Sequence, residues 1–405
     1  MAHDASDESQ ARRDSQIMSS NRLARTLSLL HIVSGSEWRD RQRQALALAS
    51  GLAAKGHRSV LACPADSALL QRARREGLEA AALSSGAIGR LLDLRRLRSS
   101  GASAWDVAHA HDAAALKTFA LAGWGGPRIP AVLTVQGDIG YGDRVLPRGT
   151  PVRQVDQFFA SSEWVWSALV RSGIPEDRIS VIHTAVDLDA FKPASAAPSN
   201  PSIDEVRQRR KQTRGSLGLP QEAFVVGSVL HLTKSKGVEV LLEAARRIRS
   251  GQTPPGEERI RVVVVGDGPD RARLERETAR LEMRDAVVFT GSRDDVPDLL
   301  GAMDVYVHAA TSGDGFPVAL REAMAMTVPV VCTDLMGIRE IIDNGKHGLI
   351  VPVGDPEALA LNILKLRRDP ALAQQIGKSG NLKVQRYGVR AMVDRAEELY
   401  FRLVR

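Results

Sequence analysis

Short, continuous apolar runs alternate with amphipathic helical stretches along the first half of the chain. The runs occupy residues 26–33, 58–63, 106–111, 131–135, 156–160 and 178–182. Between the first two runs, Ala45, Leu48 and Leu52 recur at three- and four-residue spacing, which predicts a helix over 41–54. Runs without polar alternation are typical of strands that are buried on both faces. The first half therefore predicts a parallel α/β sheet with crossover helices.

The same alternation restarts after a proline- and serine-rich segment, residues 193–203. Its apolar runs occupy residues 223–230, 261–265, 286–289, 304–309, 328–332 and 348–351, and a helix is expected from Val238. We therefore expect two facing Rossmann-like α/β domains, with ligands bound where the carboxyl ends of the two sheets meet. The expected organisation is a polar tail over 1–24, a first domain over 25–192, a linker over 193–203, a second domain over 204–388, and a closing helix over 389–405 that is a candidate for crossing back to the first domain.

Length and composition narrow the class of protein. The 405 residues are too many for one ordinary hydrophobic core and fit two domains. Only 4% of the residues are aromatic, which argues against a nucleic-acid surface of stacked rings. The net charge of +7 is spread along the chain and suits anionic small molecules or an anionic membrane face. No stretch of 18 apolar residues is present and residues 1–24 lack the apolar core of a signal peptide, so we expect a cytoplasmic protein.

The segment TSGDGFPVALREAMAM carries the most informative chemistry. Asp314 is expected in a loop, Pro317 suits the first turn of a helix, and Glu322 lies roughly 7.5 Å further along the helix axis. Free amides near Gly315 and Phe316, together with the positive helix end, form a candidate anion site between the two carboxylates. A nucleotide-sugar site needs such a set of groups. On spacing alone, an ordinary loop with surface carboxylates stays open as the alternative.

A second candidate segment is GSVLHLTKSKGVEVLLEA, residues 227–244. Its loop places His231, Lys234 and Lys236 directly after an expected buried strand and before an expected helix. Cations at this position can neutralise a diphosphate leaving group as the bond to it breaks. A solvated lysine loop is the alternative for this segment taken by itself.

Together these segments resemble the retaining glycosyltransferases of family 4, which have two facing Rossmann-like domains in the GT-B arrangement. The resemblance covers about residues 26–385. VLHLTKSKGVEVLLEA resembles the family's Arg-Leu…Lys-Gly loop, VVVVGDGPDRARLE its Gly-Asp-Gly-Pro turn, and DGFPVALREAMAMTVPVVCTD its Glu-x7-Glu block. HIVSGSEWRDRQRQALALASGLAAKGH and RISVIHTAVDLDAF are similar to the opening and the end of the acceptor-side domain.

The resemblance implies roles for the matching positions. Lys236 would contact the donor diphosphate, Glu322 would hold the ribose hydroxyls, and Asp314 would lie near the donor sugar. His231 joins Lys236 and Asp314 as a candidate catalytic residue. The other expected donor-binding residues are Lys234, Ser292, Arg293, Gly315, Phe316 and Pro317. The expected acceptor-side residues are Asp40, Arg41, His111 and Gln136. The resemblance implies no metal and no other cofactor.

Several positions depart from the family pattern. His231 stands where the family usually has an arginine, and a histidine is mostly neutral at pH 7. Asp314 replaces a glutamate, the pair Asp40-Arg41 replaces two glycines of the first loop, and Gln136 replaces the histidine of a Thr-x-His segment. The departures concentrate in the first half, so donor binding is better supported than acceptor binding or catalysis.

We therefore expect a retaining, metal-independent glycosyltransferase of the hexosyl type. It would move a sugar from a nucleotide-diphosphate donor to a hydroxyl of a glycan or lipid-linked acceptor, in bacterial polysaccharide or lipopolysaccharide synthesis. The alternative is a catalytically degenerate relative that binds nucleotide or glycan as a partner subunit. The stretch from Ile88 to Arg98 is a candidate peripheral contact with the inner face of the plasma membrane, with an ordinary crossover helix as its alternative. Nucleic acid is not an expected partner.

Overall fold

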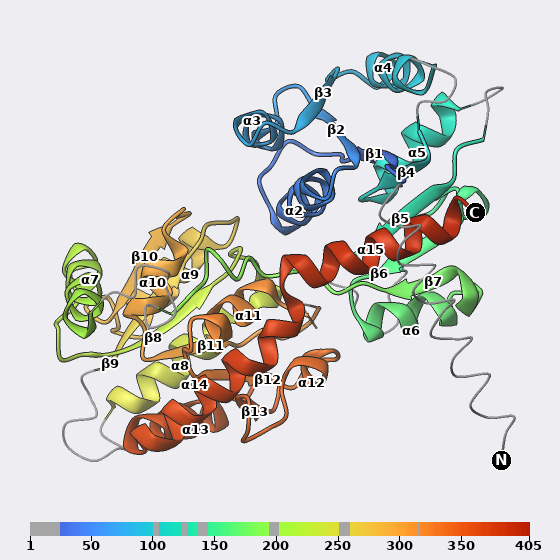
Figure 1. The fold of residues 1–405 in the computed structure, drawn as a ribbon. Coiled ribbons are helices and arrows are strands. Elements are labelled where there is room, and N and C mark those ends of the chain that lie inside the picture. The colour runs from blue at the N-terminus through green and yellow to red at the C-terminus, as the bar shows by residue number, and fades with distance from the viewer. Residues whose placement is uncertain are drawn as a thin grey trace, which may run out of the picture. The chain divides into compact units, whose positions relative to one another are not determined.

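The computed structural model describes residues 25–99, 105–123, 128–136, 145–193, 202–250, 260–313 and 316–405 (Figure 1). The expected tail over 1–24 and most of the expected linker lie outside these ranges. The chain divides into two compact units. The first unit comprises Met1–Thr134, Arg148–Gln157 and Glu397–Arg405, and the second comprises Val135–Pro147 and Phe158–Ala396.

The first sheet follows the pattern that the apolar runs predict. Among the described residues its strands are β1 (Ser28–Ile32), β2 (Arg58–Pro64), β3 (Glu79–Leu83), β4 (Val107–Ala110), β5 (Ala131–Val135), β6 (Gln157–Ala160) and β7 (Ile179–Val181), in the order β3-β2-β1-β4-β5-β6-β7. Neighbouring strands pair in parallel, as in β1 with β2 and with β4. The connecting helices are α2 (Asp40–Ala54), α3 (Ala68–Arg75), α4 (Ala87–Ser99), α5 (Ala113–Ala122) and α6 (Glu163–Arg171).

Strand β3 has no counterpart among the expected runs. Its sequence, EAAAL, contains alanines in place of the β-branched and aromatic residues that mark a strand. It forms one edge of the sheet and is only partly buried, so pairing with β2 rather than local propensity makes it a strand.

The second sheet repeats the architecture with six strands in the described part of the second unit. They are β8 (Phe224–Val229), β9 (Ile260–Val265), β10 (Val287–Gly291), β11 (Val305–His308), β12 (Val330–Thr333) and β13 (Leu349–Val351), in the order β10-β9-β8-β11-β12-β13. The helices are α7 (Ile203–Ser216), α8 (Val238–Arg249), α9 (Arg271–Arg280), α10 (Val296–Ala302), α11 (Val318–Ala325), α12 (Ile338–Ile341), α13 (Pro356–Arg368), α14 (Pro370–Val384) and α15 (Val389–Leu403).

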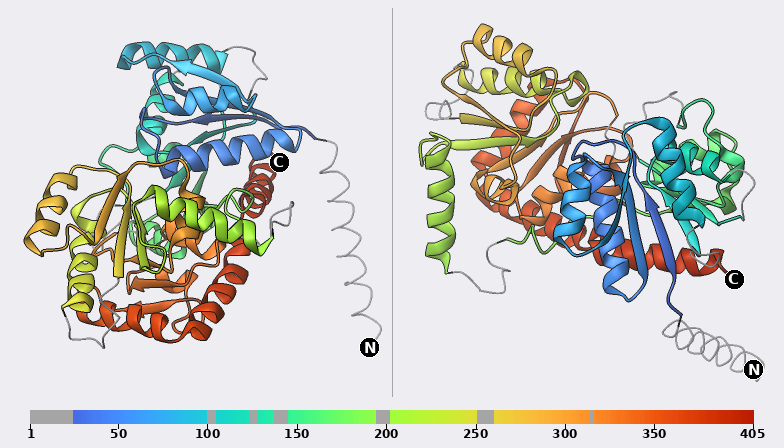
Figure 2. Two further views of the ribbon diagram at one scale, coloured as in Figure 1. Left: turned by 90° about the vertical axis from the view of Figure 1, so that its left-hand side faces the viewer. Right: turned by 90° about the horizontal axis from the view of Figure 1, so that it is seen from above.

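Helices cover both faces of this second sheet (Figure 2). Val226 and Val262 face a cluster with α8 and α13, whereas Val225 and Val263 face a second cluster with α10 and α11. Successive residues of a strand point to opposite faces, so a strand buried on both faces must be apolar throughout. This explains the unbroken run of valines in β9.

Helix α7 begins one residue inside the expected linker. The Ser202 side chain accepts a hydrogen bond from the Glu205 amide, and the Glu205 carboxylate accepts one from the Ser202 amide. This capping box satisfies amide groups that the first turn leaves unpaired, so it makes Ile203 helical. The prediction that the linker extends to residue 203 is therefore wrong by that residue.

The end of α15 belongs to the first unit. The Glu397 carboxylate lies 2.8 Å from Nε2 of His57 and 2.5 Å from Nζ of Lys55. Because the Leu27 amide donates to Nδ1 of His57, the proton of this ring lies on Nε2, which donates to Glu397. The Tyr400 hydroxyl adds a contact to His109 in β4.

No described helix is both long enough and apolar enough to cross a membrane. The two cysteines, Cys63 and Cys332, are buried free thiols, and burial raises the pKa of both.

Candidate functional site

The loop that follows β8 is joined to the turn that follows β9. The Leu230 amide donates to the Val265 carbonyl at 3.0 Å, the Leu232 amide to the Asp267 carbonyl at 3.0 Å, and the Asp270 amide to the Leu232 carbonyl at 3.1 Å. Parallel strands end at the same edge of a sheet, so both loops lie at the carboxyl edge of the second sheet. The Gly-Asp-Gly-Pro segment thus forms a turn that supports the loop of His231, Lys234 and Lys236.

The same loop is also fixed to the segment that follows β11. The Thr311 amide donates to the Ser235 carbonyl at 2.8 Å. Gly237 has a positive φ of 63°, and a Cβ atom on it would lie 1.9 Å from the Ala309 carbonyl oxygen. Only glycine allows this approach without strain. The residue after Lys236 is therefore a glycine because two backbones meet there, immediately before α8.

The three basic candidate residues of this loop differ in exposure. His231 and Lys234 are exposed, whereas Lys236 is half-buried. Lys234, Ser235 and Lys236 form a single 3-10 turn, so the two lysines are held by a defined backbone rather than by an extended loop. Positive charge is thereby concentrated at the carboxyl edge of the sheet.

Helix α11 starts at Val318, one residue later than the sequence predicts. Pro317 precedes the helix with ψ of 128°, an extended value, so its expected place in the first turn is wrong. The carbonyl of Pro317 still accepts a bond from within the helix, from Nε of Arg321 at 3.4 Å. Glu322 is the fifth helical residue and its side chain is buried, with the residue 2% exposed. Asp314 and Gly315 lie outside the described residues.

Sequence reasoning missed Arg321, whose side chain is fully buried. Its guanidinium donates to the carbonyl of Thr184 and, at 2.6 Å, to the hydroxyl of the same residue. It also lies over the ring of Phe316, 4.2 Å from the ring centroid. An arginine inside a helix of alanine, leucine and methionine was the available signal, because a charge in such a helix needs buried partners. Arg321 fastens the start of α11 to the segment after β7.

The ring of Phe316 packs within an aromatic group and does not project freely from the loop before α11. Its ring stacks on His183 with centroids 4.8 Å apart and meets Tyr387 edge to face at 5.4 Å. The Tyr387 hydroxyl donates to the Glu340 carbonyl at 3.1 Å. The Glu340 carboxylate accepts hydrogen bonds from the first two amides of α6, which stabilises that helix end. The side chain of Phe316 therefore anchors the start of α11.

Ser292 and Arg293 follow β10 and are both exposed. Arg293 forms a two-pronged pair with Asp295, at 2.7 and 2.6 Å, which raises the pKa of the guanidinium. Because β10 is the parallel neighbour of β9, these residues lie at the same sheet edge as the loops above.

On the acceptor side, Asp40 and Arg41 lie in the first turn of α2 rather than in the preceding loop. For Asp40 the expectation of a loop is wrong, because an acidic residue is favoured at a helix start. Arg41 is helical, in agreement with the helix predicted over 41–54. Burial and, secondarily, the charge of Arg41 lower the pKa of His111 to about 3. Gln136 directly follows β5 and is half-buried.

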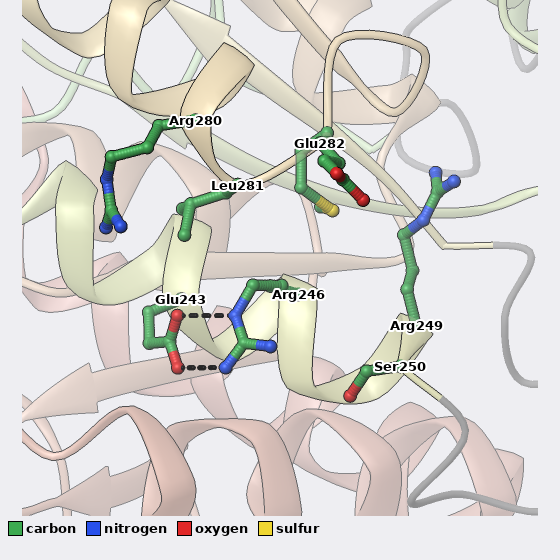
Figure 3. A pocket seen from close by; sticks show the side chains of 8 residues that line it. Glu243, Arg246, Arg249, Ser250, Arg280, Leu281 and Glu282 are labelled. Carbon is green, nitrogen blue, oxygen red and sulfur yellow. Dashed lines mark hydrogen bonds and ion pairs between the residues drawn. The ribbon is translucent and has the colours of Figure 1, made fainter.

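A pocket of about 560 Å³ lies elsewhere, at the far end of α8 (Figure 3). Its arginines are already paired, Arg246 with Glu243 and Arg249 with Asp285, so it has little free positive charge for an anionic ligand. It is about 16 Å along the helix from the lysine loop, at about 1.5 Å per residue. We exclude it from the candidate site.

Two family models match the chain in succession. The model described as Glycosyltransferase Family 4 matches residues 42–190. The model described as Glycosyl transferases group 1 matches residues 209–383, which include the lysine loop and α11. The chain belongs to glycosyltransferase family 4.

Relatives of this family-4 chain include the putative colanic acid biosynthesis glycosyltransferase WcaL of Salmonella typhimurium. It is 30% identical over 213 residues, which cover 50% of this chain and 46% of WcaL. The matched part thus spans about half the length of the curated relative. Among solved structures, Anabaena HepE in complex with UDP has a TM-score of 0.76 at 22% identity, covering 93% of this chain and 100% of HepE.

HepE in complex with UDP-glucose gives a TM-score of 0.75 at 22% identity, over 92% of this chain and 99% of HepE. At this identity the likeness shows the fold: two α/β domains with parallel sheets and crossover helices, as in GT-B glycosyltransferases. The fold class and the family resemblance that the sequence predicts are confirmed. The roles of the individual site residues stay predictions.

Proposed function

We propose that this family-4 chain transfers a sugar from a nucleotide-diphosphate sugar to a hydroxyl of a glycan or glycolipid, with retention of the anomeric configuration. One observation carries the proposal. The loop of Lys236 is hydrogen-bonded to the segment leading to α11, the helix that holds the buried carboxylate Glu322. The loop of Lys236 and the segment that leads to the helix of Glu322 are thus joined at the carboxyl edge of one parallel sheet, where ligands of such folds bind.

The donor would bind with its diphosphate between Lys236 and the start of α11. Free amides and the helix dipole attract an anion at that end, and Lys234 adds positive charge. The buried Glu322 carboxylate would accept hydrogen bonds from the two ribose hydroxyls, which its acceptor-only oxygens suit. Ser292 and Arg293, at the same sheet edge, would contact the base.

The transfer exchanges one bond at the anomeric carbon for another. The bond from the anomeric carbon to the leaving phosphate oxygen breaks, and a bond to the acceptor oxygen forms on the same face. The hydroxyl proton passes to an oxygen of the leaving phosphate. Lys236, assisted by His231, stabilises the charge that grows on this phosphate, and an interaction that strengthens in the transition state raises kcat. These cations supply the charge neutralisation, so we propose a metal-independent reaction.

The names of relatives support the substrate class. HepE binds UDP and UDP-glucose, and WcaL carries a name from colanic acid biosynthesis. We propose a hexose donor and a role in bacterial polysaccharide or lipopolysaccharide synthesis, at the cytoplasmic side of the membrane. Arg41 and His111 are proposed acceptor contacts, together with Asp40 and Gln136. Asp314 and Gly315 remain proposed donor contacts.

Helix α4 supports a proposed contact with an anionic membrane. Ile88 and Leu92, one turn apart, are 76% and 49% exposed, and Arg95 is exposed beside them. Arg98 is not available, since its guanidinium lies over the ring of Phe119 at 4.2 Å. Co-sedimentation with phosphatidylglycerol vesicles should fall for the double variant Ile88→Glu, Leu92→Glu. The matched control is the double variant Leu361→Glu, Leu382→Glu, at leucines of α13 and α14 that are 58% and 75% exposed, and equal loss in both variants would contradict a specific contact.

The test of the main proposal is an assay of donor hydrolysis and transfer by the full chain. UDP-, GDP- and ADP-sugars are supplied with and without a lipid-linked glycan, and nucleoside diphosphate release is measured with and without EDTA. Proton NMR of the product reports the anomeric configuration. We expect one donor to be turned over with retention and without loss in EDTA. An inverted product would refute the retaining assignment.

The same assay separates the alternative function. A degenerate binding subunit would bind a nucleoside diphosphate in calorimetry but release none from any donor sugar. The pair Glu322→Gln and Glu357→Gln gives a matched control, since Glu357 is an exposed glutamate in α13 of the same unit. Only the first substitution should weaken nucleotide binding.

A further inference from the structure

Three histidines converge inside the first unit. His31 lies in β1, His109 in β4, and His111 directly follows β4. In the parallel register His31 pairs with His109, and residues two apart on a strand point to the same face. All three are buried, at 0%, 1% and 2% exposure. The sequence did not reveal this group, because its members come together only when β1 and β4 pair.

The geometry of the three rings is close to that of a metal site. One ring nitrogen from each histidine lies within 4.8 Å of the other two. Nδ1 of His31 is 3.1 Å from Nε2 of His111. Two nitrogens on one tetrahedral ion lie about 3.4 Å apart when each metal–nitrogen bond is about 2.0–2.1 Å. The centroid of His31 is 5.6 Å from that of His109 and 5.4 Å from that of His111.

His31 would bind the ion through Nδ1, the ring nitrogen that lies 3.1 Å from Nε2 of His111. One imidazole gives one nitrogen to an ion, so Nε2 of His31, which is buried and has no hydrogen-bond partner among the described residues, is not one of the proposed ligand atoms.

His109 has the support that a ligating histidine needs. Its Nδ1 lies 2.6 Å from the buried Tyr400 hydroxyl, which fixes the ring from the far side. Its Nε2 lies 2.6 Å from the Thr134 hydroxyl, and its ring stacks on His111 with centroids 4.2 Å apart. If Nε2 of His109 binds the ion, it therefore gives up its contact with the Thr134 hydroxyl, and the ring gives up its stacking on His111.

We propose that His31, His109 and His111 bind one divalent transition-metal ion such as zinc. Three imidazoles on one sheet face are a ligand set that zinc and cobalt share. The ion would join β1 to β4 and, through Tyr400, to the end of α15. The site belongs to the first unit, whereas the residues proposed to bind the donor belong to the second. We therefore propose a structural role for the ion, and in this proposal His111, which is 2% exposed, binds the ion instead of the acceptor.

The experiment uses the untagged full chain, freed of metal by a chelator and titrated with Co²⁺. We expect one Co²⁺ per chain, with the visible absorption of a tetrahedral nitrogen site, displaced by one equivalent of Zn²⁺. Zn²⁺ should also raise the melting temperature. The absence of stoichiometric Co²⁺ binding by the wild-type chain overturns the proposal, and the three histidines are then a hydrogen-bonded core cluster.

Variants assign the ligands. His31→Gln and His111→Gln should each weaken Co²⁺ binding by at least about tenfold, the scale on which changes at a metal site act. His347→Gln, at a buried histidine of the second unit, is the control and should bind as the wild type does. Wild-type affinity in both cluster variants overturns the assignment. If these variants fail to fold, X-ray absorption of the Zn²⁺-loaded wild type decides, because three imidazoles give a distinct scattering pattern.

Discussion

Replacing Arg321 with methionine tests how the start of α11 is held in place. Methionine fills much of the same volume, so the change mainly removes the guanidinium. The carbonyl and the hydroxyl of Thr184 each lose the hydrogen-bond donor that Arg321 supplies. Because Thr184 is buried, water does not readily replace this donor. The bonds to the carbonyls of Phe316 and Pro317 are long, both 3.4 Å, and contribute little.

The magnitude follows from those two acceptors. A buried acceptor left without a donor costs about 1–3 kcal/mol, so the pair costs about 2–6 kcal/mol. Removing a buried charge recovers part of this cost, because the guanidinium no longer has to be desolvated. We therefore expect the second unit to lose about 2–4 kcal/mol of unfolding free energy. For a domain of about 150–250 residues this corresponds to a fall of about 4–16 °C in melting temperature.

The assay is urea unfolding followed by the near-UV signal, alongside a thermal melt. Arg339→Met is the matched control, since Arg339 pairs with Asp334 at 2.7 Å while its side chain is 67% exposed, and such a surface pair contributes about 0–1 kcal/mol. Arg321→Lys should fall between the wild type and Arg321→Met. If Arg321→Met were as stable as the control, the proposed role of Arg321 in holding the start of α11 would be refuted.

Three further predictions concern the donor residues and α15. Lys236→Ala should raise the activation free energy by about 3 kcal/mol, which lowers kcat/KM roughly 150-fold in a steady-state assay, while Lys346→Ala should leave kcat/KM unchanged. Turnover by Lys236→Ala within twofold of the wild type would contradict the role of Lys236. Glu322→Ala should weaken nucleoside diphosphate binding by about 1.5–3 kcal/mol in calorimetry, and unchanged affinity would contradict the ribose contact. Tyr400→Phe should cost about 1–3 kcal/mol in urea unfolding, because Nδ1 of His109 loses its buried hydroxyl at 2.6 Å; wild-type stability would show that this bond does not fix α15.

Local pattern was sufficient for most of the fold. Unbroken valine runs such as β9 predicted strands buried on both faces, and the spacing of Ala45, Leu48 and Leu52 predicted α2. It failed at β3, whose alanines carry no strand signal, and at the start of α11, where Pro317 has an extended ψ. A residue-level pattern reports average preferences, and these two positions are set by their neighbours in space.

The sequence by itself determined the family, the parallel α/β architecture, the cationic loop of Lys236 and the carboxylate of Glu322. These depend on periodicity and on short motifs, which a linear chain records directly. Only the tertiary structure showed why Gly237 is a glycine, what Arg321 holds, and that His31 lies against His109 and His111. Each of these depends on atoms from segments distant in sequence coming within a few ångströms. Such contacts are decided by strand pairing and helix packing, and no local spacing encodes them.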